Sequence, residues 1–165
     1  MITQYISGNI VELFKTGHHI AHGCNCHHQM GAGIAGQLAK AFPQVLEADI
    51  RETKLGDREK LGFITIAANS QPEGTAYCFN LYTQYNPGRN LDYGALLNAF
   101  RRLDMISENQ TTPLTVYIPR IGAGIAGGDW AKIETIINMF TDHTNIIVVD
   151  WDGKKWLSYT LTMHQ

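Results

Sequence analysis

The amino-acid sequence predicts an α/β protein whose helices cover both faces of one central sheet. Six short runs rich in β-branched or aromatic residues are each bounded by Gly, Pro, Asn or Asp, which is typical of strands. Three longer segments between them place apolar residues three and four positions apart, as helices packed on a sheet do. Because the two kinds of segment alternate, we expect a three-layer α/β/α domain.

The predicted elements follow from these patterns in chain order. The predicted strands are ITQYI (2–6), HIAHG (19–23), GFITIAA (62–68), AYCFNLYT (76–83), TVYIP (115–119) and NIIVVDW (145–151). The predicted helices cover residues 33–52, 91–107 and 129–143. Proline removes a helical hydrogen bond and clashes with the preceding turn. We therefore expect Pro43 to end or kink the first helix and to leave 44–52 as a separate helical piece.

Length and charge limit the classes of protein that this chain can represent. With 165 residues and 44% hydrophobic content, the chain can bury one substantial core, so we expect residues 1–165 to form a single domain. The formal net charge of −2 argues against a strong nucleic-acid footprint and makes any phosphate contact local. No apolar run approaches the roughly 18 to 20 residues that span a bilayer, so no membrane partner is expected.

The cysteines and the N-terminal residues indicate a reducing compartment. Cys24, Cys26 and Cys78 form an odd set without the spacing of a disulfide framework. The first residues, MITQYISGNI, lack the charged-then-apolar layout of a signal peptide. We therefore expect a cytoplasmic protein.

Two glycine-rich segments share the letters GAGIAG, namely MGAGIAGQ (30–37) and IGAGIAGGDW (121–130). In both places a predicted strand leads into a glycine-dense turn and then into a predicted helix. Glycine permits positive φ, which we expect at Gly33 and Gly124, and unpaired N–H groups at a helix start attract anions. Two such loops at the carboxyl ends of strands predict a grip on the two phosphates of a diphosphate. The alternative is a pair of merely tight turns.

The histidines and cysteines of HGCNCHH (22–28) raise two further hypotheses. Thiolate and imidazole are good zinc ligands, but the C-x-C spacing differs from that of common structural zinc sites, so no metal is expected. A cysteine near a helix start can have a lowered thiol pKa, yet the sequence names no partner for it. Cys24 is better explained as a small buried residue at a strand end. No cofactor is expected either.

Three segments resemble the macro domain family, a module that binds ADP-ribose, in their order and spacing. They are SGNI (7–10), AHGCNCHHQMGAGIA (21–35) and PRIGAGIAGGDW (119–130). Within that family the chain is similar to the branch of the ADP-ribose 1″-phosphate phosphatases and the terminal ADP-ribose glycohydrolases, and it also resembles small phage proteins. The resemblance covers nearly the whole chain and implies a mixed central sheet and ADP-ribose as the small-molecule ligand.

The resemblance assigns roles to individual residues. Asn25 corresponds to the asparagine that binds the distal ribose, and Asn9 to the position that accepts the adenine amino group. Trp151 is the candidate aromatic residue over adenine, with a cap on the core beneath the WDGKKW turn as its alternative role. The backbone that lines the ribose and the diphosphate corresponds to Gly31, Ala32, Gly33, Ile34, Gly122, Ala123, Gly124, Ile125, Ala126 and Gly127.

The chain departs from the glycohydrolases of this family at two positions. Their lysine, which forms a covalent sugar adduct, corresponds to Gln84 or Tyr85, and their assisting aspartate corresponds to Ala126. Neither substitute supports lysine-adduct chemistry. Asp129 lies three residues further on and is interpreted as the N-cap of the helix that follows it.

His22 matches a histidine of the phosphatases and lies where a strand meets the first glycine-rich segment. With Asn25 it forms the predicted catalytic pair, because an imidazole with a pKa of about 6.5 can give or take a proton at neutral pH. The alternative is a strand-end histidine bonded to the backbone. Arg89 and Asn90 either close over the distal ribose or form a surface turn.

These assignments together predict hydrolysis of an ADP-ribose derivative, with ADP-ribose 1″-phosphate as the first choice. Removal of ADP-ribose from a modified protein or nucleic acid is the second hypothesis, and the partner is then an ADP-ribosylated macromolecule. The third hypothesis is a reader that binds ADP-ribose without turnover.

Overall fold

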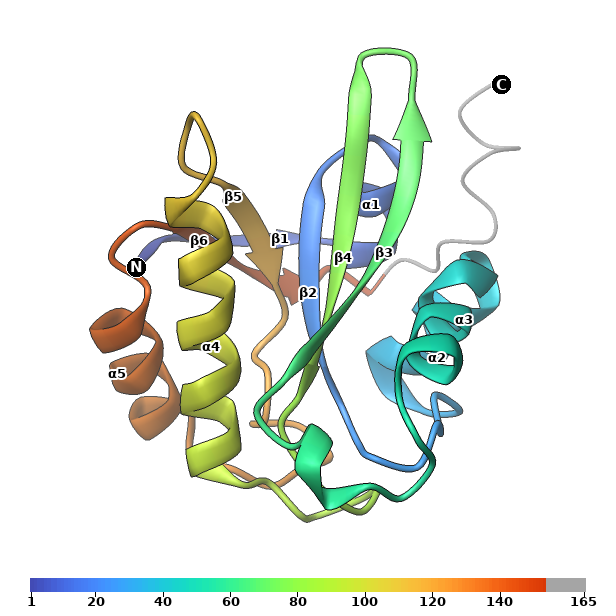
Figure 1. Cartoon of the computed structure of the whole chain (residues 1–165). Helices are drawn as coiled ribbons and strands as arrows, with labels where there is room; N and C mark the ends of the chain where they lie inside the picture. Colours follow the sequence, from blue (N-terminus) through green and yellow to red (C-terminus); the bar gives the residue numbers. More distant parts are fainter. Residues whose placement is uncertain (154–165) are drawn as a thin grey trace.

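The computed structural model describes residues 1–153, which form a mixed sheet of six strands with helices on both faces (Figure 1). The strand order is β1-β6-β5-β2-β4-β3. All neighbouring strands are parallel except β3, which runs antiparallel to β4 at one edge. The strands are β1 (Ile2–Gly8), β2 (His19–Cys24), β3 (Ile64–Gln71), β4 (Gly74–Tyr82), β5 (Thr115–Ile118) and β6 (Asn145–Trp151).

Five α-helices within residues 1–153 make the two outer layers. They are α1 (Ile10–Lys15), α2 (Gly33–Ala41), α3 (Pro43–Glu52), α4 (Tyr93–Glu108) and α5 (Trp130–Phe140). Helices α1, α2 and α3 pack on one face of the sheet through a buried cluster that includes Phe14, Leu38 and Val45. Helices α4 and α5 pack on the other face through a second cluster that includes Phe100 and Ile133. The predicted three-layer α/β/α architecture with a mixed sheet is therefore confirmed (Figure 1).

Local sequence signals placed most element boundaries correctly. All six predicted strands are present, and Pro43 is the first residue of α3, where its missing N–H costs no helical hydrogen bond. The predicted N-cap is also confirmed, because the Asp129 side chain accepts a hydrogen bond from the Ala131 amide at the start of α5. Helix α1 was not predicted, since its six residues are too few to show a helical period.

The topology opens a crevice at the carboxyl edge of the sheet. Strands β2 and β5 are parallel neighbours, but the chain leaves β2 toward α2 on one face and leaves β5 toward α5 on the other. Connections that diverge in this way leave a gap between the two strand ends, and α/β proteins bind ligands there. The two glycine-rich segments both follow these strands, so the fold brings them to the same edge.

The described residues bear on two further expectations, the number of domains and the presence of membrane-spanning helices. The single-domain prediction for residues 1–165 includes residues 154–165, which lie outside the described residues. Among the described helices, none combines the length and the apolar character that crossing a bilayer requires.

Candidate ligand site between two glycine-rich loops

The first loop (residues 25–32) is fastened to two segments, the turn that follows α3 and the segment that follows β4. The Cys26 amide donates to the Tyr85 carbonyl at 2.9 Å, and the Cys26 carbonyl accepts from the Gly56 amide at 2.7 Å. His28 has a φ of 54°, a conformation that is uncommon outside glycine, and its Nε2 lies 2.9 Å from Thr53 Oγ1. These contacts tie the first loop to its neighbours through both backbone and side-chain groups.

The first loop leads into an open helix start, as the sequence predicts. The N-cap of α2 is Ala32, whose methyl group cannot accept a hydrogen bond, so no side-chain cap bonds to the first amides of the helix. Gly33 has a φ of 60°, which confirms the expected left-handed conformation at this residue. The start of α2 can therefore offer backbone N–H groups and the positive end of the helix dipole to an anion.

The second loop (residues 119–129) folds back on itself. The Gly128 amide donates to the Gly122 carbonyl at 2.7 Å, and Gly122 has a φ of 82°. A Cβ at Gly128 would lie 2.2 Å from Leu91 Cδ2 and 2.7 Å from the Gly122 oxygen, so only glycine fits there. Two expectations for this loop are wrong. Gly124 does not have a positive φ, and the second loop does not lead into an open helix start, because Asp129 caps α5 as predicted. Of the two described helices that follow the glycine-rich loops, α2 is the one whose start has no side-chain cap.

The two loops meet over a pair of adjoining cavities of about 600 Å³ and 250 Å³. Both cavities are lined by Ala32 of the first loop and Ile125 of the second, and by Gln84 of the segment after β4. The sequence-predicted residues that line at least one of them are His22, Asn25, Gly31, Ala32, Gly33, Ile34, Gly122, Gly124, Ile125 and Ala126. Ala123 and Gly127 lie in the second loop without lining either cavity.

Asn25 lines the larger cavity and braces the first loop from within. Its Nδ2 donates to the Gln29 carbonyl at 2.9 Å, and its Oδ1 accepts from the His27 amide at 2.9 Å. Each of these atoms can make one more hydrogen bond. The side chain is therefore placed to contact a ligand while it fixes the shape of the loop.

His22 lines the smaller cavity, but its imidazole is buried and neutral. Only 1% of the residue is exposed, and burial lowers its pKa to about 4, against the opposing effects of the Asn80 hydrogen bond and the Asp49 charge. The expectation of an ordinary pKa near 6.5 is therefore wrong. The interpretation as a histidine bonded to the backbone is also wrong, because Nε2 lies 2.6 Å from the Asn80 side-chain oxygen.

The Asn80 amide fixes which nitrogen of His22 carries the hydrogen. Asn80 Nδ2 donates to the Val45 carbonyl at 3.0 Å and to Thr65 Oγ1 at 3.1 Å. A carbonyl can only accept, so Oδ1 must face the histidine, and Nε2 is the protonated nitrogen. This assignment leaves Nδ1 of His22 with the free lone pair, 3.9 Å from Cys24 Sγ.

A buried chain of hydrogen bonds continues from Asn80 to an ion pair beneath the first loop. Thr65 Oγ1 bonds to the Tyr82 hydroxyl, which donates to Asp49 Oδ1, each at 2.7 Å. The Lys60 ammonium donates to the same Asp49 oxygen at 3.1 Å and to Thr53 Oγ1 at 2.7 Å. Lys60 and Asp49 are both buried, so the pair compensates two charges inside the domain. Sequence analysis missed this pair because neither residue stands in a recognisable motif.

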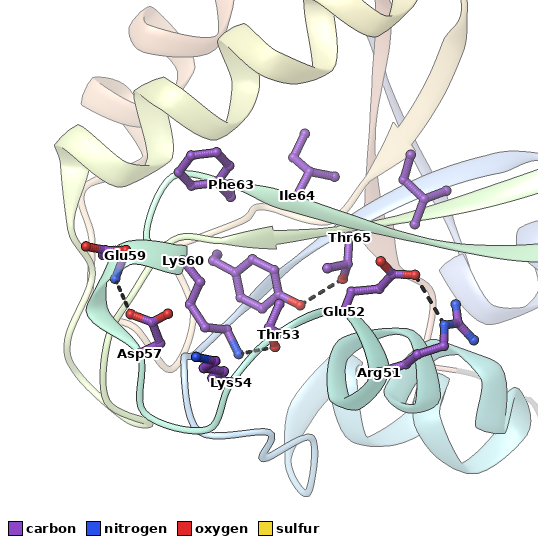
Figure 2. A pocket seen from close by; sticks show the side chains of 12 residues that line it. Arg51, Glu52, Thr53, Lys54, Asp57, Glu59, Lys60, Phe63, Ile64 and Thr65 are labelled. Atoms are coloured by element: carbon purple, nitrogen blue, oxygen red, sulfur yellow. Dashed lines mark hydrogen bonds and ion pairs between the residues drawn. The ribbon is translucent and has the colours of Figure 1, made fainter.

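A third cavity of about 770 Å³ lies at the free edge of the sheet, beside β3 (Figure 2). Lys60, Thr53 and Thr65 are among the residues that line it, and Arg51 and Glu52, which also line it, contact each other at 3.2 Å. It is larger than either loop cavity. We nevertheless place the site at the loops, because the edge cavity has no open helix start and its buried cation is already paired.

The cysteines near the first loop are buried and, in the described part of the chain, are not grouped as metal ligands. Cys24 is buried at the end of β2, which confirms its predicted role as a small buried residue. Burial raises the pKa of Cys24 well above its usual range and that of Cys26 to about 11, so neither thiol is activated as a nucleophile. Within residues 1–153, no three His, Cys, Asp or Glu side chains are grouped so that they could hold a metal ion.

The two predicted adenine residues lie outside the loop cavities, at neighbouring strand ends. Trp151 is the last residue of β6, is 53% exposed and lies beside Gly8 of β1. Asn9 follows Gly8 and caps α1, where its Oδ1 accepts from the Val11 amide at 2.9 Å. An adenine amino group would have to share that oxygen. The WDGKKW turn proposed beneath Trp151 includes residues 154–156, which lie outside the described residues.

The site is of the kind in which an α/β domain holds a ligand between loops at the carboxyl edge of its sheet. A sequence profile of the macro domain matches residues 21–137. The chain therefore belongs to the macro domain family. A solved structure with the same fold is the macrodomain of Thermus aquaticus DarG, with a TM-score of 0.72 and 20% identity over 91% of this chain and 98% of that chain.

Two relatives extend over most of the chain. A 17.5 kDa protein from the tk-vs intergenic region of Enterobacteria phage T4 is 50% identical over 152 residues, which cover 92% of this chain and 98% of that protein. The ADP-ribose 1″-phosphate phosphatase of Debaryomyces hansenii is 26% identical over 156 residues, which cover 79% of this chain and 87% of that protein.

Proposed function

We propose that this macro domain binds ADP-ribose between its two loops and hydrolyses ADP-ribose 1″-phosphate to ADP-ribose and phosphate. The observation that carries the proposal is the meeting of the two loops over one crevice, with the open start of α2 on one side and the second loop on the other. The similarity to the phosphatase of Debaryomyces hansenii supports this choice of substrate.

The diphosphate of the ligand would lie in the smaller cavity, between the two loops. There the amides at the start of α2 face the backbone of the second loop, and backbone N–H groups are well suited to phosphate oxygens. The distal ribose would then occupy the larger cavity, which Asn25 lines. This placement also brings a phosphate on the 1″ oxygen close to the first loop.

The hydrolysis itself needs a water molecule and a site that stabilises negative charge. A water oxygen forms a bond to phosphorus, the bond between phosphorus and the 1″ oxygen breaks, and that oxygen leaves with a proton from solvent. Backbone N–H groups fixed around the phosphoryl group stabilise its charge without reorganising, which is the largest contribution in many enzymes. The fastened first loop is suited to this role, because its amides are held in place.

His22 contributes by position in this proposal. With a pKa of about 4, roughly one molecule in a thousand carries a protonated imidazole at pH 7, so His22 is a poor general acid. Its hydrogen bond to Asn80 holds the end of β2, from which the first loop begins. The predicted proton transfer by His22 is therefore replaced by a positioning role.

A reader without turnover is the second candidate, and the buried state of His22 favours it. Because His22 is neutral and Cys24 is not activated, neither residue supplies a general acid or a nucleophile for hydrolysis. Such a site can still bind its ligand. The glycohydrolase hypothesis gains less support. Gln84 lines both loop cavities where that reaction would need a lysine, and Ala126 occupies the place of its aspartate.

Three substrates tested side by side would separate these functions. The protein is incubated with ADP-ribose 1″-phosphate, ADP-ribosylated protein and ADP-ribosylated DNA, and released phosphate and free ADP-ribose are followed. Phosphate release from the first substrate alone is the expected result. Calorimetric binding of ADP-ribose with no turnover of any substrate would identify a reader instead, and free ADP-ribose from either macromolecule would identify a glycohydrolase.

A further inference from the structure

Arg89 lies where the segment between β4 and α4 (residues 83–92, the arch) meets the second loop. A Cβ at Gly127 would lie 2.5 Å from Cγ, 2.9 Å from Nε and 3.1 Å from Cζ of Arg89, so the arginine side chain runs along the backbone of Gly127. The Leu91 amide donates to the Ala126 carbonyl at 3.3 Å and ties the arch to the same loop. Arg89 can occupy this position because residue 127 is a glycine, whereas any larger residue would clash with the arginine side chain.

Hydrogen bonds within the arch stabilise its conformation. Gln84 Nε2 donates to the carbonyls of Asn86 at 2.8 Å and Gly88 at 2.9 Å. The Asn86 amide in turn donates to Asn90 Oδ1 at 2.7 Å. Gly88 lines the larger loop cavity, and Arg89 is its neighbour in the chain. Arg89 itself lines neither loop cavity as the structure stands, but its backbone is internally braced next to a residue that does. Its side chain would have to leave Gly127 to reach the cavity that would hold the distal ribose.

The charge of Arg89 is uncompensated, unlike that of the arginine on the cavity wall. Within the described part of the chain, no carboxylate lies within ion-pair distance of the Arg89 guanidinium. Arg120 lines the smaller cavity, but Asp150 holds it through two contacts of 2.8 Å and 3.0 Å. Among the described residues that line the two cavities, there is consequently no unpaired cation for a phosphomonoester.

We propose that Arg89 binds the phosphate on the distal ribose and makes the site prefer a phosphorylated derivative over ADP-ribose itself. The inference rests on the proposed function, because it names the residue that recognises the terminal group of that substrate. A guanidinium offers two parallel N–H groups to two phosphate oxygens, whereas ADP-ribose has no charged group at that end. The exposed side chain can turn from Gly127 toward the cavity without breaking an ion pair.

The test compares the affinities of two ligands that differ only in this phosphate. Calorimetry gives Kd for ADP-ribose and for ADP-ribose 1″-phosphate with wild-type protein, with Arg89→Gln and with Arg101→Gln, a control at an exposed arginine on α4. We expect Arg89→Gln to weaken the phosphorylated ligand about tenfold or more and ADP-ribose less than about twofold, as for one charge-assisted contact. Arg101→Gln should change neither Kd.

The outcomes separate this inference from the proposed function. An equal loss for both ligands, or no loss for either, would overturn the role of Arg89 and leave the proposed reaction standing. Phosphate release is measured separately, so selective binding through Arg89 without release supports the inference and overturns the reaction. Wild-type protein that binds neither ligand overturns both.

Discussion

Gly33 at the start of α2 lies against Ile125 of the second loop, and a Cβ at Gly33 would lie 3.3 Å from Ile125 Cδ1. This approach brings together two segments that are 92 positions apart in the sequence and that both line the smaller cavity. A side chain at position 33 would therefore require the end of the Ile125 side chain to move by a few tenths of an ångström. The contact therefore relates the choice of glycine at position 33 to the shape of the ligand site.

Valine substitutions at Gly33 and Gly124 should have different consequences for stability. Gly33→Val places a β-branched residue at a φ of 60° and against Ile125, which we expect to lower the free energy of unfolding by about 1 to 3 kcal/mol and to abolish ADP-ribose binding. Gly124→Val has open space and no positive φ, so it should lose affinity with little change in stability. Urea unfolding and calorimetry measure both effects. Unchanged affinity in folded Gly124→Val would remove the second loop from the site.

Substitution of Asn25 should weaken binding and turnover together. Asn25→Ala removes the brace to Gln29 and His27 and a polar group from the larger cavity, so we expect ADP-ribose affinity to fall about tenfold. Asn109→Ala removes a comparable side-chain hydrogen bond at the end of α4 and serves as the matched control. If both variants bind ADP-ribose equally well, Asn25 has no part in recognition.

Two histidines should show pKa values shifted in opposite directions in one NMR titration. Burial lowers the pKa of His22 to about 4, whereas the hydrogen bond to Asp104 raises the pKa of His143 above its usual value. The His22 imidazole signals should therefore stay constant as the pH falls from 8 to about 5, while those of His143 change at a pH above about 6.5. An inflection of His22 near pH 6.5 would restore its predicted role in proton transfer.

The lowered pKa of His22 makes the free energy of unfolding depend on pH. Because folding lowers the pKa of His22, the unfolded chain binds more protons below about pH 6.5, and the free energy of unfolding falls as the pH drops toward 4. The contribution is fully present above about pH 6.5 and amounts to on the order of 3 kcal/mol. Urea unfolding at a series of pH values measures the slope. A free energy of unfolding that stays constant from pH 7 to pH 4 would contradict the buried neutral state.

Removal of one charge of the buried Lys60–Asp49 pair should destabilise the domain more than removal of both charges. Lys60→Met leaves the buried Asp49 carboxylate without its cation, so we expect a loss of about 3 kcal/mol or more in the free energy of unfolding. The double variant Lys60→Met/Asp49→Asn removes both charges and should recover part of that loss. Lys54→Met changes an exposed lysine at the same cavity and should be nearly neutral. Equal effects at Lys60 and Lys54 in urea unfolding would show that the buried Asp49 carboxylate does not depend on the Lys60 charge.

Local patterns were sufficient where neighbours in the sequence decide the conformation. Pro43 starts α3 because its own ring fixes φ and removes an N–H, and Asp129 caps α5 because its carboxylate reaches an amide two residues away. Helix α1 also had such a signal, since Asn9 is a preferred N-cap residue and accepts from the next helical amides. Its short length hid the periodic pattern that identified the other helices.

The sequence by itself determined the alternation of strands and helices, the two glycine-rich loops and the macro domain resemblance, because each depends on contiguous residues. The tertiary structure alone decided the state of His22, whose pKa follows from burial and from Asn80, 58 positions away. It also decided that Arg89 lies on Gly127 and that Lys60 pairs with Asp49. Burial and charge compensation depend on every element packed around a group, so no local pattern contains them.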